Sequence, residues 1–209
     1  MEMVPAYSNW SFAVKTLSFR RKLAVGLVTL LGVVLLLPSF FQFAEHRHGH
    51  HINDRVLNIV APRDVSIPIV ICIWSLILLF VFRSFADPQF FLLYLYGFLV
   101  VCLCRFVTIG FMPLEPPEGL IQLKDPISNY FYGTKTFITK DLFFSGHTAT
   151  LALLAFCFKR KWDKAVAVLG ALAVGVLVLV QHIHYTIDVI AAPFFSWLAY
   201  LLAKGIVNH

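Results

Sequence analysis

The sequence predicts an all-α integral membrane protein, in which six transmembrane helices form one bundle and both termini are cytoplasmic. Three observations lead to this prediction. Hydrophobic residues make up 59% of the chain and charged residues only 13%, whereas a soluble domain carries about 25% charged residues. The apolar residues gather in runs long enough to cross a bilayer, and basic residues are dense in alternate connections between these runs. We therefore expect residues 1–209 to form a single membrane domain.

The first 22 residues are predicted to lie at the membrane surface. Trp10, Val14 and Leu17 follow helical spacing, and the basic residues at 20–22 supply a charged side. This pattern is typical of a short interfacial helix on the cytoplasmic side. Residues 1–22 are not expected to be a cleavable signal, because the apolar run that follows them is too long for a signal core.

Six apolar runs are expected to be the transmembrane helices. They cover residues 23–43, 67–82, 88–104, 142–158, 165–182 and 184–203. The turn at 83–87 is so short that the second and third spans must form an antiparallel hairpin. Small residues in the fifth span, Ala171, Ala173 and Gly175, suit close helix packing.

The distribution of lysine and arginine predicts the orientation of the bundle. The connections on the side of the N-terminus are short and hold ten basic residues, namely Lys15, Arg20, Arg21, Lys22, Arg83, Lys159, Arg160, Lys161, Lys164 and Lys204. The other seven are spread over far longer loops, so the N-terminal side is expected to be cytoplasmic. Residues 105–141 then form a long exoplasmic loop, and a loop of this length is usually functional.

Charge and histidine content do not require a nucleic-acid or metal partner. Much of the net charge of +6 lies beside apolar segments, where it serves topology and lipid-headgroup contact. The histidine cluster at 45–51 could bind a divalent metal. We favour a solvated loop near lipid phosphates, because no partner carboxylate or thiolate stands out. The four cysteines lie inside apolar runs and are interpreted as packing residues, so we expect no metal, cofactor or nucleic acid.

Two short runs carry the residues with the clearest chemistry. Residues 145–148 read Ser-Gly-His-Thr, and residues 184–188 read His-Tyr-Thr-Ile-Asp. His184 and Asp188 are four positions apart, so on a helix the carboxylate reaches the ring. An imidazole held by an aspartate, with His147 nearby, is suited to phosphoryl or acyl transfer. The structural alternative is two polar residues that satisfy one another in a bundle, but ionisable groups at membrane depth are usually functional.

For a phosphate ester bound between these helix ends, the three residues have distinct expected roles. His184 would be the nucleophile, and Asp188 would hold its other ring nitrogen. His147 would protonate the departing lipid oxygen and later take a proton from the attacking group. The helices of residues 142–203 would therefore carry the catalytic residues.

Three further residues are expected to bind the phosphate. Ser145 and Gly146 suit the start of a helix, where free N–H groups favour an anion. Arg105 follows an apolar run, where it is positioned to neutralise phosphoryl oxygens. The alternative for this arginine is a snorkelling anchor.

A headgroup site is a weaker prediction. Tyr130 and Tyr132, together with Asp141 or Glu115, could hold a choline or ethanolamine cation. The alternative is that the aromatic residues only belong to an interfacial belt and that Asp141 caps the helix that follows it.

The paired motifs resemble a known family. Ser-Gly-His-Thr and His-Tyr-Thr-Ile-Asp-Val are similar to the last two motifs of the type 2 phosphatidic acid phosphatase (PAP2) superfamily. The closer similarity is to its sphingomyelin synthase and inositol phosphorylceramide synthase branch. Three further features fit that branch: Arg-Phe-Val-Thr at 105–108 leading into Leu-Glu-Pro-Pro at 114–117, Asp141 six residues before His147, and His182 two before His184.

The resemblance implies a six-helix lipid enzyme with a His-His-Asp triad that opens to the exoplasmic, periplasmic or lumenal, side. By position, the triad is His147, His184 and Asp188, with a phosphohistidine intermediate on His184. In the synthase branch, a phospho-alcohol headgroup passes from a glycerophospholipid to ceramide, and diacylglycerol is released. The implied partners are therefore a membrane phospholipid and ceramide or diacylglycerol, and a homo-oligomer is compatible with this layout.

One departure bears on the type of reaction. Lipid phosphatases of the superfamily carry a Ser-Arg pair ahead of the nucleophilic histidine, where this chain has Leu177 and Val178, and Arg105 is not followed by proline. A phosphomonoester dianion needs more positive charge than a diester monoanion, so these differences argue against a pure phosphatase. Water as acceptor would give a phospholipase C-type hydrolysis. A lipid phosphatase and a non-enzymatic lipid-binding or transport protein remain the alternatives.

Overall fold

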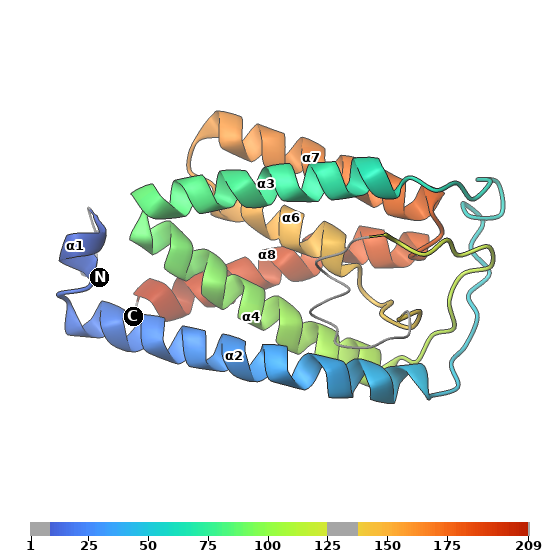
Figure 1. Cartoon of the computed structure of the whole chain (residues 1–209), viewed down its shortest axis with the longest axis horizontal. Helices are drawn as coiled ribbons and strands as arrows, with labels where there is room; N and C mark the ends of the chain where they lie inside the picture. Colours follow the sequence, from blue (N-terminus) through green and yellow to red (C-terminus); the bar gives the residue numbers. More distant parts are fainter. Residues whose placement is uncertain (1–8, 125–137, 209) are drawn as a thin grey trace.

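The fold is described by a computed structural model that covers residues 9–124 and 138–208. Tyr130 and Tyr132 lie outside the described residues, so the headgroup prediction is not addressed at these positions. The described parts form seven helices, and the six long ones run side by side along one axis (Figure 1). The helices are α1 (Trp10–Ala13), α2 (Leu17–Glu45), α3 (Ser66–Ala86), α4 (Pro88–Phe111), α6 (Gly146–Cys157), α7 (Lys161–Val180) and α8 (Thr186–Asn208).

Five of these helices, α2, α3, α4, α7 and α8, are long and apolar enough to cross a membrane. The multi-pass membrane prediction is thus supported by five candidate spans rather than six. The difference is α6, which has 12 residues and is about 18 Å long, against a hydrocarbon core of about 30 Å. A span was predicted over 142–158, but the helix begins only after Ser145, whose side chain caps it. Most of α6 is buried against α4, α7 and α8, which separate it from lipid.

The N-terminal segment differs from the predicted interfacial helix over residues 1–22. In the described part, α1 is a single turn, and α2 already begins at Leu17, so the basic residues at 20–22 belong to α2. Asn9 caps α1, and the extended backbone of Thr16 separates the two helices. Trp10 ties this segment to the bundle, because its indole N–H donates to the carbonyl of Ser84 at 2.8 Å.

The α3–α4 hairpin is tighter than predicted, and α4 is longer. Asp87 alone separates the two helices, and its side chain accepts a hydrogen bond from the Phe90 N–H at the start of α4. The predicted third span ended at residue 104, whereas α4 continues to Phe111, so the long connection starts at residue 112. Arg105 therefore lies inside α4 rather than at its end, and its side chain is buried and paired inside the bundle.

The centre of the bundle is closely packed, and two of the three small residues predicted to allow this, Ala171 and Gly175, are buried there. A Cβ atom added to Gly170 would lie 2.4 Å from Leu76, and one added to Gly175 would lie 2.9 Å from Val189. Ala171 is buried, while Ala173 faces outward. The close approach of α7 to α3 and α8 therefore depends on the two glycines.

One end of the bundle is covered by loops, and the other carries both chain termini (Figure 1). At the loop end, the segment before α3 meets the segment after α4. The His50 N–H donates to the carbonyl of Pro113 at 3.0 Å, and the Glu115 N–H donates to the carbonyl of His50 at 3.1 Å. These two segments thus form a layer over the ends of α7 and α8.

A buried amide at the end of α7 links this layer to α3. The Gln181 side chain is fully buried. Its Nε2 donates to Ser66 Oγ at 2.8 Å and lies 3.2 Å from the carbonyl of Gln122, and its Oε1 accepts from the Val65 N–H at 3.2 Å. The Gln181 amide therefore provides hydrogen-bond partners both to the groups at the start of α3 and to the loop that covers it.

Gln181→Met, which keeps the length of the side chain but removes the amide, should destabilise the protein. Buried groups left without partners cost about 1–3 kcal/mol each, so we expect a loss of about 2 kcal/mol and a melting temperature lower by roughly 4–8 °C. Thermal unfolding of the purified protein, followed by circular dichroism, measures this change. Gln122→Met is the matched control, because Gln122 is exposed. Equal melting temperatures for both variants would contradict the role given to Gln181.

Candidate active site

His184 and Asp188 form a buried pair where α8 begins. His184 lies two residues before α8 rather than inside a helix as predicted, and Asp188 lies in its first turn. The predicted contact is nevertheless present, with His184 Nδ1 3.3 Å from Asp188 Oδ2. The same carboxylate oxygen accepts from the Tyr185 N–H at 3.0 Å. His184 is 1% exposed and Asp188 is 0% exposed, so neither side chain is in contact with bulk water. The carboxylate therefore holds the imidazole ring inside the protein.

The other oxygen of this carboxylate is unusual. Asp188 Oδ1 is buried and has no hydrogen-bond partner among the residues that the structure describes. A buried acceptor without a donor is costly. A positive charge on the adjacent His184 ring would offset part of this cost.

His147 is brought next to this pair by the start of α6. Ser145 caps the helix, and its side chain accepts from the Thr148 N–H. The Ser145 N–H donates to the carbonyl of Asp188 at 3.1 Å, which joins the start of α6 to the first turn of α8. As a result, the rings of His147 and His184 lie with their centroids 6.4 Å apart at an angle of 64°. The structure therefore brings together the three residues that the two motifs singled out.

Arg105 reaches the same place from α4. Its guanidinium donates to the carbonyl of Phe144 and forms an ion pair with Asp141. It also lies against the first residue of α6, since a Cβ atom added to Gly146 would be only 2.9 Å from Arg105 Cζ. Arg105 is thus held beside the N-terminus of α6, next to Ser145 and Gly146, and phosphate binding by these three residues stays a prediction. Its ion pair with Asp141 was not predicted.

Both acids that were considered for a headgroup cation are paired with cations of the protein. Asp141 pairs with Arg105. Glu115 lies 2.9 Å from Lys140 Nζ and accepts from the Gly49 N–H at 2.8 Å. These partners, first the Gly49 N–H and then Lys140, hold the pKa of Glu115 below its usual value. Glu115 therefore stabilises the loop layer in this structure.

Asp54, which the sequence analysis missed, orients the start of α8. Its two carboxylate oxygens accept from the N–H and the hydroxyl of Thr186, at 2.6 Å and 2.9 Å. Burial acts to raise the pKa of Asp54, but the hydrogen bonds from Thr186 and from the Leu57 and Val56 N–H groups outweigh it, so the pKa is lowered. No local pattern marks Asp54, because its partner is 132 residues away in the chain.

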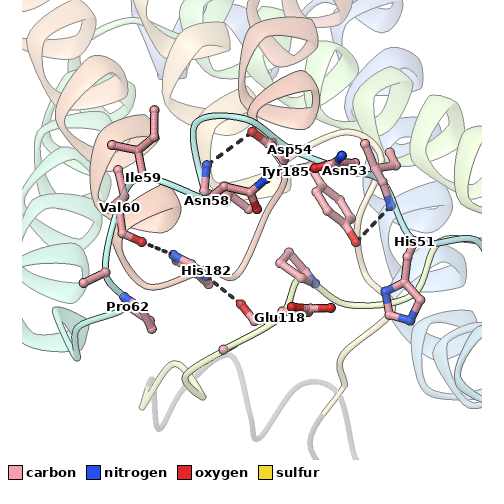
Figure 2. A pocket seen from close by; sticks show the side chains of 15 residues that line it. His51, Asn53, Asp54, Asn58, Ile59, Val60, Pro62, Glu118, His182 and Tyr185 are labelled. Atoms are coloured by element: carbon pink, nitrogen blue, oxygen red, sulfur yellow. Dashed lines mark hydrogen bonds between the residues drawn. The ribbon is translucent and has the colours of Figure 1, made fainter.

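His182 holds the turn before His184 against two loops. Its Nδ1 lies 2.7 Å from the carbonyl oxygen of Glu118, and its Nε2 lies 2.8 Å from that of Val60 (Figure 2). Its backbone φ of 55° is in the left-handed region that non-glycine residues seldom adopt. The ring thus bridges loops that precede α3 and follow α4. It also lines a cavity of about 840 Å³, whose wall includes Tyr185.

The histidine cluster at 45–51 does not form a metal site in the described residues. Among residues 9–124 and 138–208, no group of three or more histidine, cysteine, aspartate or glutamate side chains could hold a metal ion. The backbone of His50 instead pairs with the segment after α4. All four cysteines are free thiols.

Comparison with known proteins points to the same third of the chain. Residues 140–205 match the family model described as PAP2 superfamily C-terminal. A search of curated proteins gives no significant match. The matched region contains α6, α7 and all but the last residues of α8, with His147, His184 and Asp188. This region is therefore similar to the C-terminal part of the PAP2 superfamily, which suggests lipid phosphatase-type chemistry.

Proposed function

We propose that the protein is a membrane-embedded lipid phosphotransferase or phospholipase C-type enzyme that acts on glycerophospholipid headgroups and releases diacylglycerol. One observation carries this proposal. The buried His184–Asp188 pair lies beside His147 with 6.4 Å between ring centroids. At this separation both rings can reach the same phosphoryl group, one as the nucleophile and the other as the general acid.

In the first step, His184 Nε2 attacks phosphorus, because Nδ1 is directed at Asp188. The bond between phosphorus and the diacylglycerol oxygen breaks, and His147 gives its proton to that oxygen. The phosphohistidine ring gains positive charge, which the Asp188 carboxylate stabilises.

In the second step, the neutral His147 takes a proton from the acceptor hydroxyl, which attacks the phosphohistidine. The phosphorus–nitrogen bond breaks and His184 returns to its neutral form. A ceramide-like alcohol as acceptor gives a transferase, and water gives a phospholipase C. Arg105 and the first N–H groups of α6 would bind the phosphoryl oxygens during both steps.

The balance of charge favours a diester substrate over a monoester. Asp141 neutralises much of the charge of Arg105, and Leu177 and Val178 are apolar where a phosphatase would carry its Ser-Arg pair. A diester monoanion requires less compensation than a monoester dianion. A PAP2-type lipid phosphatase is the second candidate, because the family match itself favours phosphatase chemistry.

We place the reaction on the exoplasmic face. The end of the bundle with the two termini also carries Lys159 and Arg160 between α6 and α7, and Lys161 and Lys164 at the start of α7. By the positive-inside rule, that end is cytoplasmic. His147 and His184 lie at the other end, under the loop layer.

Substitutions in the three central residues test the mechanism. His184→Ala should abolish headgroup turnover, and His147→Ala should lower it by about 10²–10⁴-fold. Asp188→Asn keeps the shape but loses the charge, and it should also be inactive. His51→Ala, in the loop layer and exposed, is the control. Turnover by His184→Ala near the wild-type rate would overturn the proposal.

Gly146→Ala tests the placement of Arg105. The added methyl group would lie 2.9 Å from Arg105 Cζ, so it should displace the guanidinium and lower kcat/KM by roughly 10- to 100-fold. Gly110→Ala in α4 is the matched control, because nothing lies within 4 Å of the added carbon. Unchanged kinetics in Gly146→Ala would remove Arg105 from the mechanism without affecting the role of His184.

The two reaction classes are separated by their products. In vesicles of phosphatidylcholine, phosphatidylethanolamine and ceramide, the purified protein should release diacylglycerol faster than it releases phosphate from phosphatidic acid. A ceramide that carries a phosphocholine or phosphoethanolamine headgroup identifies the transferase, and free phosphocholine or phosphoethanolamine identifies the hydrolase. Faster release of phosphate from phosphatidic acid would establish the phosphatase instead, and no turnover of any lipid would favour a non-enzymatic protein.

A further inference from the structure

A second cavity lies at the opposite end of the bundle from the candidate active site. Its volume is about 510 Å³, within the range of small-molecule sites. It is formed where α4 and α7 begin and where α6 and α8 end, near the chain termini (Figure 1). The length of α6, about 18 Å, separates it from His147. It is therefore distinct from the site that the motifs mark.

The lining of this cavity is basic. It includes Lys159, Lys164 and Lys204 and no acidic residue. Lys159 is engaged, because its Nζ lies 2.6 Å from Asp87 Oδ2. Lys164 and Lys204 form no ion pair within the described ranges. The acid nearest to Lys164 in sequence, Asp163, is held by Arg83 at 2.7 Å, so two cations at the cavity are uncompensated.

Helix dipoles do not cancel this charge. The positive ends of α4 and α7 and the negative ends of α6 and α8 meet at this level, so their contributions offset each other. The lysines therefore decide the sign of the potential, and the site favours an anion. The amide side chains of Gln89 and Asn208 add hydrogen-bonding groups to the lining.

The remaining wall is apolar and aromatic. Phe156 and Tyr200 stack with their ring centroids 6.1 Å apart, and Leu93 lies in the same wall. Tyr200 and Lys204 are four residues apart on α8, so they share one face of the helix. A lysine above an apolar helix face matches a lipid, whose phosphate lies at the membrane surface above its acyl chains.

We propose that this cavity binds the phosphate-bearing headgroup of an anionic phospholipid in the membrane leaflet opposite the candidate active site. Lys164 and Lys204 contact the phosphate, while the acyl chains lie along Phe156 and Tyr200. Because the lipid touches α4, α7 and α8 together, it stabilises the end of the bundle that has no loop layer. The proposal is independent of the reaction assigned to His184.

Lipid binding to the full-length protein in detergent, measured by native mass spectrometry, tests the proposal. The probes are phosphatidylglycerol and phosphatidylcholine with identical acyl chains, and the mass of the bound lipid reveals any turnover. The test variant is Lys164→Gln/Lys204→Gln. The control, Arg160→Gln/Lys161→Gln, removes two charges from the same end of the bundle without touching the cavity lining. Melting temperatures without lipid establish that both variants are folded.

We expect the wild type and the control to bind phosphatidylglycerol equally and in preference to phosphatidylcholine, and the test variant to bind it roughly 20-fold more weakly. An equal loss of phosphatidylglycerol binding in both variants would indicate general attraction to a basic surface and would overturn the proposed site. Unchanged binding in the test variant would do the same. Displacement of the lipid by millimolar inorganic phosphate would assign the cavity to free phosphate rather than to a lipid.

Discussion

Asp188 is the residue on which the arrangement of the candidate active site depends. One oxygen of its carboxylate contacts the His184 ring and accepts from the Tyr185 N–H. The backbone carbonyl of Asp188 accepts a hydrogen bond from the Ser145 N–H, where α6 begins. A single buried residue thus sets the position of the proposed nucleophile and of the helix that carries His147. Because the carboxylate is out of contact with water, its charge acts on the adjacent ring at short range and with little screening.

The loop layer gives this arrangement its rigidity. Asp54 binds the start of α8, and the His182 ring spans the two loops over it. Tyr185 adds a third contact, since its hydroxyl donates to the carbonyl of Glu115 at 3.0 Å. The short segment between α7 and α8 is therefore held from several directions. Such positioning by surrounding hydrogen bonds is what a phosphoryl-transfer site needs, because its catalysis rests on orientation and charge.

The two ends of the bundle differ in whether their charged side chains are paired. At the loop end, the buried Arg105 is matched with Asp141 and Glu115 with Lys140, which offsets the cost of removing ions from water. At the other end, Lys164 and Lys204 have no acidic partner in the described structure, and they border an open cavity. The paired ions at the loop end suit a site whose charged groups stay in one position. The unpaired lysines at the other end suit a surface that contacts anionic headgroups.

Composition and the length of the apolar runs predicted helices that cross a membrane, and five of the six predicted spans are long and apolar enough to do so. The spacing of His184 and Asp188 predicted a contact that is present. Local patterns could do this because helix formation and contacts between residues four positions apart depend on nearby sequence. Tertiary structure decided the contacts between segments that are distant in the chain, and the helix bounds that depend on those contacts. It shortened α6 below a full span, carried α4 past Arg105, and joined Asp54 to Thr186. These features follow from how loops and helices pack against one another, and no local spacing encodes which distant partner will satisfy a buried charge.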